Sequence, residues 1–271
     1  MPENSIDIAV VGAGPTGLMA AIALAASGVP VTMIAPPARA DHRTTALLAS
    51  SVTALDTVGV WRTCEAQAAP LRVMRLIDDT GRLLRAPEAR FDAREIGLEA
   101  FGYNIENNIL VAALNARAAE LPALRRIDEE ADAISCEDDA VRITLRSGKV
   151  VGARLIVGAD GHRSLCRSAA GIGTNLQDYR QVALTYNVVH ERGHQGISTE
   201  FHTATGPFTL VPRPGNRSSI VCVVDAAQAD RLDGMDAPAL ARELERRAHS
   251  ILGKINVETD RGRFPLATEI A

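Results

Sequence analysis

Residues 6–17 read Ile-Asp-Ile-Ala-Val-Val-Gly-Ala-Gly-Pro-Thr-Gly, and this stretch decides the fold. Its first half is mostly apolar, which is typical of a strand buried on both faces, and the glycines follow directly. Residues 18–27 are rich in alanine and leucine and predict a helix that ends at Gly28. A short apolar run at 31–35 completes a strand–helix–strand unit, for which we expect a right-handed crossover.

Each glycine of this loop has a separate physical role in binding a dinucleotide. Gly12 permits the tight turn, Gly14 lets the backbone approach a diphosphate, and Gly17 allows the helix to pack closely on the strand. The free N–H groups and the dipole at the start of the helix attract the anion. The pattern and its position therefore predict a dinucleotide site, and a turn that needs glycine only for its shape is the weaker interpretation.

The acid that usually binds the adenosine ribose is missing from this unit. It normally stands at the end of the second strand, where this chain has Ala35 followed by two prolines. Arg39 or Asp41 could take over this contact, and the sequence does not choose between them.

The segment after the second strand has a structural and a functional interpretation. Residues 44–58 have helical spacing, so Asp41 or Thr44 could cap a helix there and Arg43 could be a solvated charge. The functional interpretation depends on the resemblance described below.

A later turn, at the end of another apolar strand, also has a structural and a functional interpretation. Asp160 and Gly161 could simply form a turn. Alternatively, Asp160 lies at the carboxyl edge of a parallel sheet and accepts a hydrogen bond from a cofactor hydroxyl, while Gly161 allows close approach.

The rest of the chain predicts a mixed α/β and α+β fold, in which a Rossmann-like domain is interleaved with an antiparallel-sheet domain. We expect the first domain over 1–72 and 101–178, and the second over 73–100 and 179–271. The expected helices are 108–121 and 237–252, and the expected strands are 73–78 and 82–86 as a hairpin, 131–137, 141–146, 149–157, 182–190, 198–202, 208–211 and 219–224.

Composition excludes several classes of function. The net charge is -4, aromatic residues make up 3% of the chain, and no basic run appears, so we expect no nucleic-acid partner. His190 and His194 have a metal-ligand spacing, but glycines beside them oppose a helix, and we expect no metal site. The cysteines are widely spaced, which predicts reduced, mostly buried thiols in a cytosolic protein at Cys64, Cys136, Cys166 and Cys222.

No membrane-spanning segment is expected. The most apolar stretch, residues 17–38, is interrupted by Gly28 and Pro30, whereas a span needs roughly 18 or more uninterrupted apolar residues. We expect a cytoplasmic protein and leave open a peripheral contact with the inner membrane.

Three motifs, in their order along the chain, resemble the FAD-dependent aromatic hydroxylases, the 4-hydroxybenzoate hydroxylase-like group. They are the glycine loop, the segment Arg43-Thr-Thr-Ala-Leu and the segment Gly158-Ala-Asp-Gly-x-x-Ser. The likeness covers nearly the whole chain. Four further segments are more similar to the ubiquinone-biosynthesis hydroxylases within this group, namely 103–107, 206–208, 217–221 and 264–266.

The resemblance implies FAD as cofactor, NAD(P)H as reductant and a ubiquinone precursor or related phenol as substrate, with no transferable catalytic residue. Residues 182–224 would form the roof of an apolar substrate cavity that suits a prenylated ring. The implied cofactor-binding residues are Gly12, Gly14 and Gly17 at the diphosphate, Arg43 at the flavin nucleotide, Asp160 with Gly161, and Asn108, where the group often has arginine or glutamine.

The group also carries a later Gly-Asp flavin motif, and this chain ends at Ala271 before any match to it. We therefore expect a fragment that retains FAD weakly and does not turn over. Two alternatives stay open. One is an NAD-dependent dehydrogenase that uses the same loop, and the other is an inactive flavoprotein fragment that binds a lipid or a partner protein in a biosynthetic complex.

Overall fold

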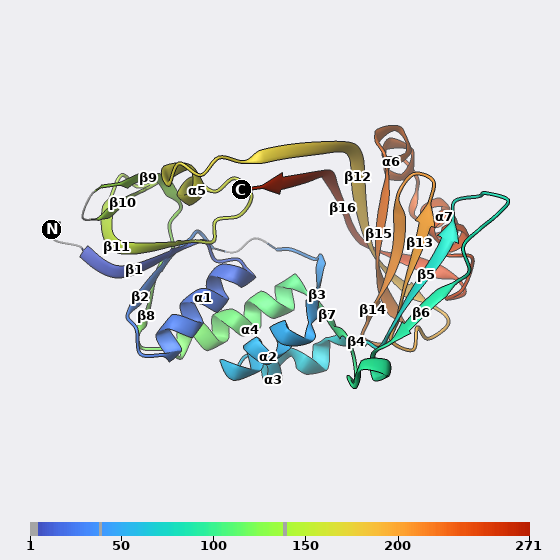
Figure 1. Cartoon of the computed structure of the whole chain (residues 1–271), viewed down its shortest axis with the longest axis horizontal. Coiled ribbons are helices and arrows are strands. Elements are labelled where there is room, and N and C mark those ends of the chain that lie inside the picture. Colours follow the sequence, from blue (N-terminus) through green and yellow to red (C-terminus); the bar gives the residue numbers. More distant parts are fainter. Residues whose placement is uncertain (1–4, 38–39, 138–139) are drawn as a thin grey trace.

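The strand–helix–strand unit predicted around the glycine loop is confirmed in a computed structural model that describes residues 5–37, 40–137 and 140–271 (Figure 1). Strand β1 (Ser5–Val11) leads through the loop into α1 (Pro15–Ala26) and then β2 (Val31–Ile34). Strand β1 pairs in parallel with β2 on one side and with β11 (Val150–Gly158) on the other.

This unit is the centre of a six-stranded sheet with the order β8-β2-β1-β11-β10-β9. The outer strands are β8 (Leu124–Ile127), β9 (Ala131–Cys136) and β10 (Val141–Leu145). On one face of the sheet α1 packs beside α4 (Asn107–Ala119), as Figure 1 shows. Apolar side chains of α1, α4 and the central strands form a continuous core that includes Val10, Leu18, Ile22, Leu110 and Leu114.

A second, seven-stranded sheet has the order β16-β12-β15-β14-β13-β5-β6 and is antiparallel except for the pair β13–β5. Helices α6 (Ala226–Asp233) and α7 (Ala237–Arg247) cover one of its faces. The predicted antiparallel sheet is thus confirmed, with the strands β5 (Val73–Asp79), β6 (Ala89–Asp92), β12 (Asn175–His190), β13 (Ile197–Thr203), β14 (Pro207–Arg213), β15 (Arg217–Asp225) and β16 (Ile255–Ile270).

Strands β12 and β16 form a long antiparallel ribbon that runs from the six-stranded sheet to the far sheet (Figure 1). The sequence predicts that β12 begins at residue 182, whereas it begins at Asn175. Strand β16, which contains residues 264–266, is not predicted. The first residues of β12 are exposed on both faces, so they show no apolar–polar alternation from which a strand can be predicted.

The predicted helix over residues 44–58 is wrong in its first part. Residues Thr44–Leu48 form strand β3, and helix α2 covers Ala49–Thr57. Strand β3 pairs with β7 (Gly102–Glu106), which in turn pairs with β4 (Ala69–Leu71) in a small three-stranded sheet. A partner strand that lies so far along the chain leaves no local signal in the sequence of β3.

Two other predicted elements also need correction. The hairpin over 73–86 is wrong, because β5 pairs with β6 and residues 82–86 form no strand. Helix α7 ends at Arg247 rather than at residue 252, because His249 and Ser250 adopt positive φ angles that a helix cannot contain. The remaining short elements are α3 (Trp61–Cys64), η1 (Glu65–Gln67), η2 (Ala93–Ile96) and α5 (Leu165–Ala169).

We propose the domain division 1–72 with 101–178 and 73–100 with 179–271, because most strands of each large sheet lie within one of these pairs of segments. Within the described residues, no helix is both long enough and apolar enough to cross a membrane. Cys64, Cys166 and Cys222 are free and buried, as expected, whereas Cys136 is free and exposed.

Candidate cofactor and substrate site

The glycine loop and the 158–161 turn are in direct contact, although they are far apart in the sequence. Strands β1 and β11 run in parallel, and Val11 lies opposite Gly158. The amide of Ala159 donates to the carbonyl of Val11 at 2.8 Å. A Cβ atom at position 12 would lie 2.2 Å from the carbonyl oxygen of Ala159, so only glycine allows this contact, and its φ of +108° also favours glycine.

The other two glycines have distinct surroundings. A Cβ atom on Gly17 would lie 2.0 Å from the carbonyl oxygen of Gly12, so α1 packs directly on the loop. Gly14 has an ordinary φ of -70°, and a Cβ atom there would meet nothing within 4 Å. Gly14 therefore faces open space at the edge of the sheet.

The start of α1 is suited to an anion. No side chain caps the helix, and Pro15 stands at its first turn. The uncapped amides and the positive end of the helix dipole lie next to the open space at Gly14, which is where a diphosphate binds in Rossmann-like units. The residues present therefore fit the diphosphate of a dinucleotide.

Asp160 lies beside the glycine loop, and its carboxylate organises the turn. One oxygen accepts from the hydroxyl of Ser164 at 2.6 Å, and the other accepts from the amide of Cys166 at 3.1 Å. Burial opposes ionisation, but these hydrogen bonds lower the pKa of Asp160 below its ordinary value. Since a carboxylate offers about four lone-pair positions, acceptor capacity remains for a ligand hydroxyl. Gly161 has a φ of +83° and also faces open space.

Arg43 is fixed in place rather than being a loosely solvated charge. Its Nε and Nη2 atoms donate to the two carboxylate oxygens of Asp41 at 2.8 and 2.7 Å. Its guanidinium carbon lies 4.9 Å from the ring centroid of Phe264, a distance typical of a cation–π contact. The hydrogen bonds from Arg43 lower the pKa of Asp41 to about 2, against the opposing effect of burial. Because β3 begins at Thr44, neither Asp41 nor Thr44 is the predicted helix cap.

The first turn of α4 anchors the segment that carries Arg43. The side-chain oxygen of Asn108 accepts from the amide of Asp41 at 2.7 Å. The neighbouring Asn107 donates from its side chain to the Asp41 carboxylate at 2.8 Å and from its amide to the carbonyl of Arg43 at 2.9 Å. Asn108 thus acts as a positioning residue for this segment. Arg39, the other candidate for the ribose contact, lies outside the described residues.

A cavity of about 300 Å³ lies between the segment 40–44 and the far sheet. A continuous chain of hydrogen bonds connects residues that line this cavity. Thr44 donates to Ser219 at 3.1 Å, Ser219 donates to the side-chain oxygen of Asn187 at 3.0 Å, and Asn187 donates to the carbonyl of His42 at 2.9 Å. The cavity therefore joins the Arg43 segment to the strands that were expected to form a substrate roof.

Strand β16 also contributes to this cavity, which the sequence did not reveal. Arg261, Gly262 and Phe264 line it together with residues of β12 and β15. A Cβ atom at position 262 would lie 2.2 Å from the hydroxyl of Thr185, so a larger residue there would displace the Thr185 or Phe264 side chain. No local pattern marks residues 261–264, since their contacts depend on the distant strand β12.

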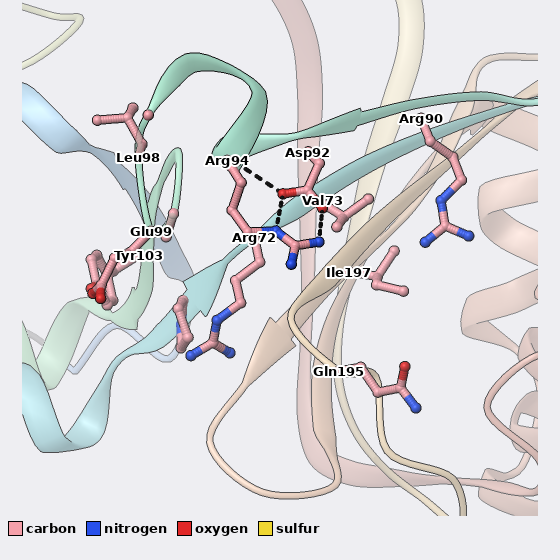
Figure 2. Close-up of a pocket in the computed structure, with 13 residues that line it drawn as sticks. Arg72, Val73, Arg90, Asp92, Arg94, Leu98, Glu99, Tyr103, Gln195 and Ile197 are labelled. Carbon is pink, nitrogen blue, oxygen red and sulfur yellow. Dashed lines mark hydrogen bonds and ion pairs between the residues drawn. The ribbon is translucent and has the colours of Figure 1, made fainter.

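A larger hollow lies elsewhere and contains none of the proposed cofactor-binding residues (Figure 2). It measures about 720 Å³ and is bordered by Arg72, Arg90, Tyr103 and Ile197. Arg94 also borders it, and its guanidinium pairs with Asp92, as Figure 2 shows. Volume alone does not identify a site, and the smaller cavity is the one that Arg43 and Phe264 of the motifs line.

Both histidines with the metal-ligand spacing are held by other groups. His190 contacts the carbonyl of Arg192 at 2.8 Å and the hydroxyl of Ser218 at 3.0 Å. His194 lies 2.8 Å from the carbonyl of Arg213. In the part of the chain that the structure describes, no cluster of potential metal ligands occurs.

Comparison with known proteins agrees with this geometry. Residues 5–265 match the family described as FAD binding domain. The ubiquinone hydroxylase UbiL of Rhodospirillum rubrum is 34% identical over 277 residues, which cover 99% of this chain and 63% of that protein. The 3-demethoxyubiquinol 3-hydroxylase of Escherichia coli is 31% identical, over 98% of this chain and 69% of that protein. The chain thus spans less than two thirds of the Rhodospirillum relative.

Solved structures share the fold at low sequence identity. The p-nitrophenol 4-monooxygenase PnpA of Pseudomonas putida superimposes with a TM-score of 0.73 at 18% identity, covering 98% of this chain and 70% of that chain. The flavin-dependent monooxygenase PieE, solved with FAD and substrate, gives a TM-score of 0.76 at 17% identity, covering 100% of this chain and 51% of that chain.

Proposed function

This chain belongs to the FAD-binding domain family, and from that premise we propose that it serves a flavin-dependent monooxygenase that hydroxylates an aromatic ring. FAD, rather than the NAD of a dehydrogenase, is the dinucleotide of this family. The contact of Gly12 with Ala159 and Asp160 carries the proposal, because it brings both cofactor motifs to one edge of the sheet. An inactive flavoprotein is the competing hypothesis, and the experiment below distinguishes the two.

The proposed substrate is a ubiquinone precursor or a related phenol. Two relatives that align with almost all of this chain are named as a ubiquinone hydroxylase and a 3-demethoxyubiquinol 3-hydroxylase. In the proposed reaction, NAD(P)H, a proton, O₂ and the aromatic C–H compound give NAD(P)⁺, water and the phenol product. One oxygen atom enters the new C–O bond, and the other leaves as water.

When bound, FAD would supply the redox chemistry, and the side chains of this protein would bind and orient the reactants. The proposed cofactor contacts are Gly12, Gly14 and Gly17 at the diphosphate, with Asp160 and Gly161 beside them. Arg43 would contact the flavin nucleotide, while Asn108 positions the segment that carries Arg43.

We propose that the cavity of about 300 Å³ receives the aromatic ring. This volume lies at the lower end of the range for small-molecule sites, roughly 300–1,000 Å³. Thr44, Ser219 and Asn187 offer hydroxyl and amide groups that can hydrogen-bond to a phenol oxygen. Phe264 and Val221 supply apolar surface that excludes water from the reacting atoms.

A prenylated phenol partitions into lipid, so we propose that the protein works in the cytoplasm beside a membrane. This would bring the active site close to a substrate that is scarcely soluble in water. A biosynthetic complex with partner proteins is a further setting that would satisfy the same requirement.

The experiment is to purify the protein, reconstitute it with FAD and measure NAD(P)H and O₂ consumption with and without a prenylated phenol. The proposal predicts a yellow protein, faster consumption when the phenol is present, and a hydroxylated product detected by mass spectrometry. A yellow protein that forms no product would favour the inactive flavoprotein. A protein that is colourless after incubation with saturating FAD and removal of the unbound FAD would contradict the cofactor assignment itself.

A further inference from the structure

The loop that connects β5 to β6 exposes two adjacent leucines. Leu83 and Leu84 have relative exposures of 101% and 88%, the highest among the exposed large apolar side chains of the described residues. In Figure 1 the loop extends from the edge of the seven-stranded sheet, at the end of the molecule away from the six-stranded sheet. Isolated exposed apolar residues are common in soluble proteins, but an adjacent pair at a protruding tip indicates a contact.

Hydrogen bonds at the base of the loop hold this shape. One carboxylate oxygen of Asp78 accepts from the amide of Thr80 at 3.1 Å and from its hydroxyl at 2.7 Å. The other oxygen accepts from the amide of Ala86 at 2.9 Å. Asp78 therefore clamps both ends of the loop, and the leucines at its tip are held away from the protein core.

The leucines are flanked by positive charges. Arg82 and Arg85 lie on either side of the pair and are exposed, and Arg85 donates to the carbonyl of Arg82 at 3.3 Å. Two nearby carboxylates have partners already, since Asp78 holds the loop and Asp79 lies 2.9 Å from the ring of His249. Both arginines are exposed, and among the described residues no ion pair joins either of them to a carboxylate. The exposed Glu88 is the acidic residue of the same loop.

We propose that residues 82–85 insert into the surface of an anionic lipid bilayer. Leucine side chains at a protruding tip reach the boundary between headgroups and acyl chains, while flanking arginines extend to the phosphates. The net charge of the chain is -4, so the molecule as a whole is not attracted to anionic lipid. The proposed binding therefore depends on the local positive charges of Arg82 and Arg85.

This inference rests on the proposed function only for its purpose, which is to bring the protein to a lipid-dissolved substrate. Lipid binding is measured without flavin, reductant or phenol. A chain that does not bind lipid could therefore still carry out the proposed hydroxylation. A chain that forms no product could still be tested for lipid binding through residues 82–85.

The test is co-sedimentation of the full chain with phosphatidylglycerol-rich vesicles and, separately, with pure phosphatidylcholine vesicles. We expect binding to the anionic vesicles that weakens as salt is added. The double variant L83S/L84S should bind roughly tenfold more weakly, because it removes the apolar insertion. The double variant R82Q/R85Q should lose about fivefold per arginine on anionic vesicles and little on neutral ones.

Two matched variants control for general changes of surface. Leu176→Ser alters a leucine of β12 that is 65% exposed, and R62Q/R125Q removes two exposed arginines elsewhere. Both should bind vesicles like the unmodified chain. The proposal is overturned if the unmodified chain ignores anionic vesicles, or if L83S/L84S binds them equally well. A fall in molecular mass for L83S/L84S in sedimentation equilibrium, with unchanged vesicle binding, would instead identify a protein interface and also overturn it.

Discussion

Gly12, Gly14 and Gly17 belong to one motif, yet a methyl group would have a different consequence at each position. At positions 12 and 17 it would meet backbone atoms at 2.2 and 2.0 Å, whereas at position 14 it would meet nothing within 4 Å. Two of the glycines are therefore needed for the fold, whereas no packing contact requires the third, for which we propose a ligand contact. The sequence pattern predicts all three, but only the structure separates these roles.

Replacing Gly12 by alanine should destabilise the protein. The new Cβ atom would force β1 and the 158–161 turn apart, and the φ of +108° would be strained for alanine. We expect a loss of roughly 2–4 kcal/mol in the free energy of unfolding, measured by urea denaturation. Gly28→Ala is the matched control, because Gly28 also has a positive φ but no close neighbour; an equal loss in both variants would show that backbone strain, and not the contact with Ala159, is responsible.

Asn108→Ala should weaken FAD binding while changing stability modestly. The variant removes the acceptor for the amide of Asp41, so the segment carrying Arg43 loses one of its anchors. One such hydrogen bond contributes about 1 kcal/mol to stability. Fluorescence titration with FAD measures the affinity, and unchanged affinity would show that Asn107 alone positions the segment.

At the scale of elements, a buried ion network joins the small sheet to the seven-stranded sheet. Arg213 of β14 is 5% exposed in its side chain and pairs with Glu106 of β7 and, at 2.6 Å, with Glu258 of β16. Glu258 also pairs with Arg217. These contacts fix β7, and with it the start of α4, against strands that line the candidate cavity.

Arg213→Met should therefore be destabilising. It leaves the Glu106 and Glu258 carboxylates without their shared partner. Because both carboxylates are partly exposed and Arg217 still pairs with Glu258, we expect a loss at or below the lower end of the roughly 3–5 kcal/mol for a fully buried pair. Arg217→Met is the control, since Arg217 is 49% exposed in its side chain and such pairs contribute about 0–1 kcal/mol. Thermal unfolding of both variants tests this difference, and equal losses would contradict it.

The charged face of α7 should make stability depend on pH. Glu243 is 11% exposed in its side chain. Hydrogen bonds from Arg246, and then from Arg247, lower its pKa from 4.5 to about 2 despite burial. A pKa lowered by folding stabilises the protein above the unfolded value, and this contribution is lost as pH falls from about 4.5 toward about 2.

Glu243→Gln should accordingly lose about 1–2 kcal/mol of stability at neutral pH and little near pH 2. Denaturant unfolding at a series of pH values measures the difference between variant and unmodified protein. A difference that does not change with pH would show that Glu243 acts through packing and not through its charge.

The same elements show how far the sequence predicts the structure. Strands β1 and β2 and helix α1 were predicted because their apolar runs and glycine turn are local signals. The sequence predicts a helix where β3 lies and does not predict β16, since each strand is stabilised by a partner strand more than 50 residues away. The cavity depends on both of these strands, which is why its residues on β16 were not predicted.

At the scale of the whole molecule, the two large sheets are joined by the β12–β16 ribbon (Figure 1). The candidate cavity lies where the Arg43 segment meets the second sheet. The glycine loop and Asp160 lie at one edge of the first sheet, whereas the proposed substrate contacts Asn187 and Ser219 lie on the second sheet. Arg43 borders the same cavity as these substrate contacts, so the proposed cofactor and ring sites meet there. The loop with residues 82–85 extends from the outer edge of the second sheet, away from both.

The most direct measurement is a titration of FAD into the unmodified chain and into Gly14→Ala and Gly14→Glu, with Gly173→Ala as a control at another glycine that has no neighbour within 4 Å. Unfolding temperatures should be alike in all four proteins. We predict that FAD affinity falls roughly tenfold or more in Gly14→Ala, falls further in Gly14→Glu, where a carboxylate would face the diphosphate, and is unchanged in Gly173→Ala. A folded Gly14→Glu protein that binds FAD as tightly as the unmodified chain would contradict the assignment of this loop to the cofactor.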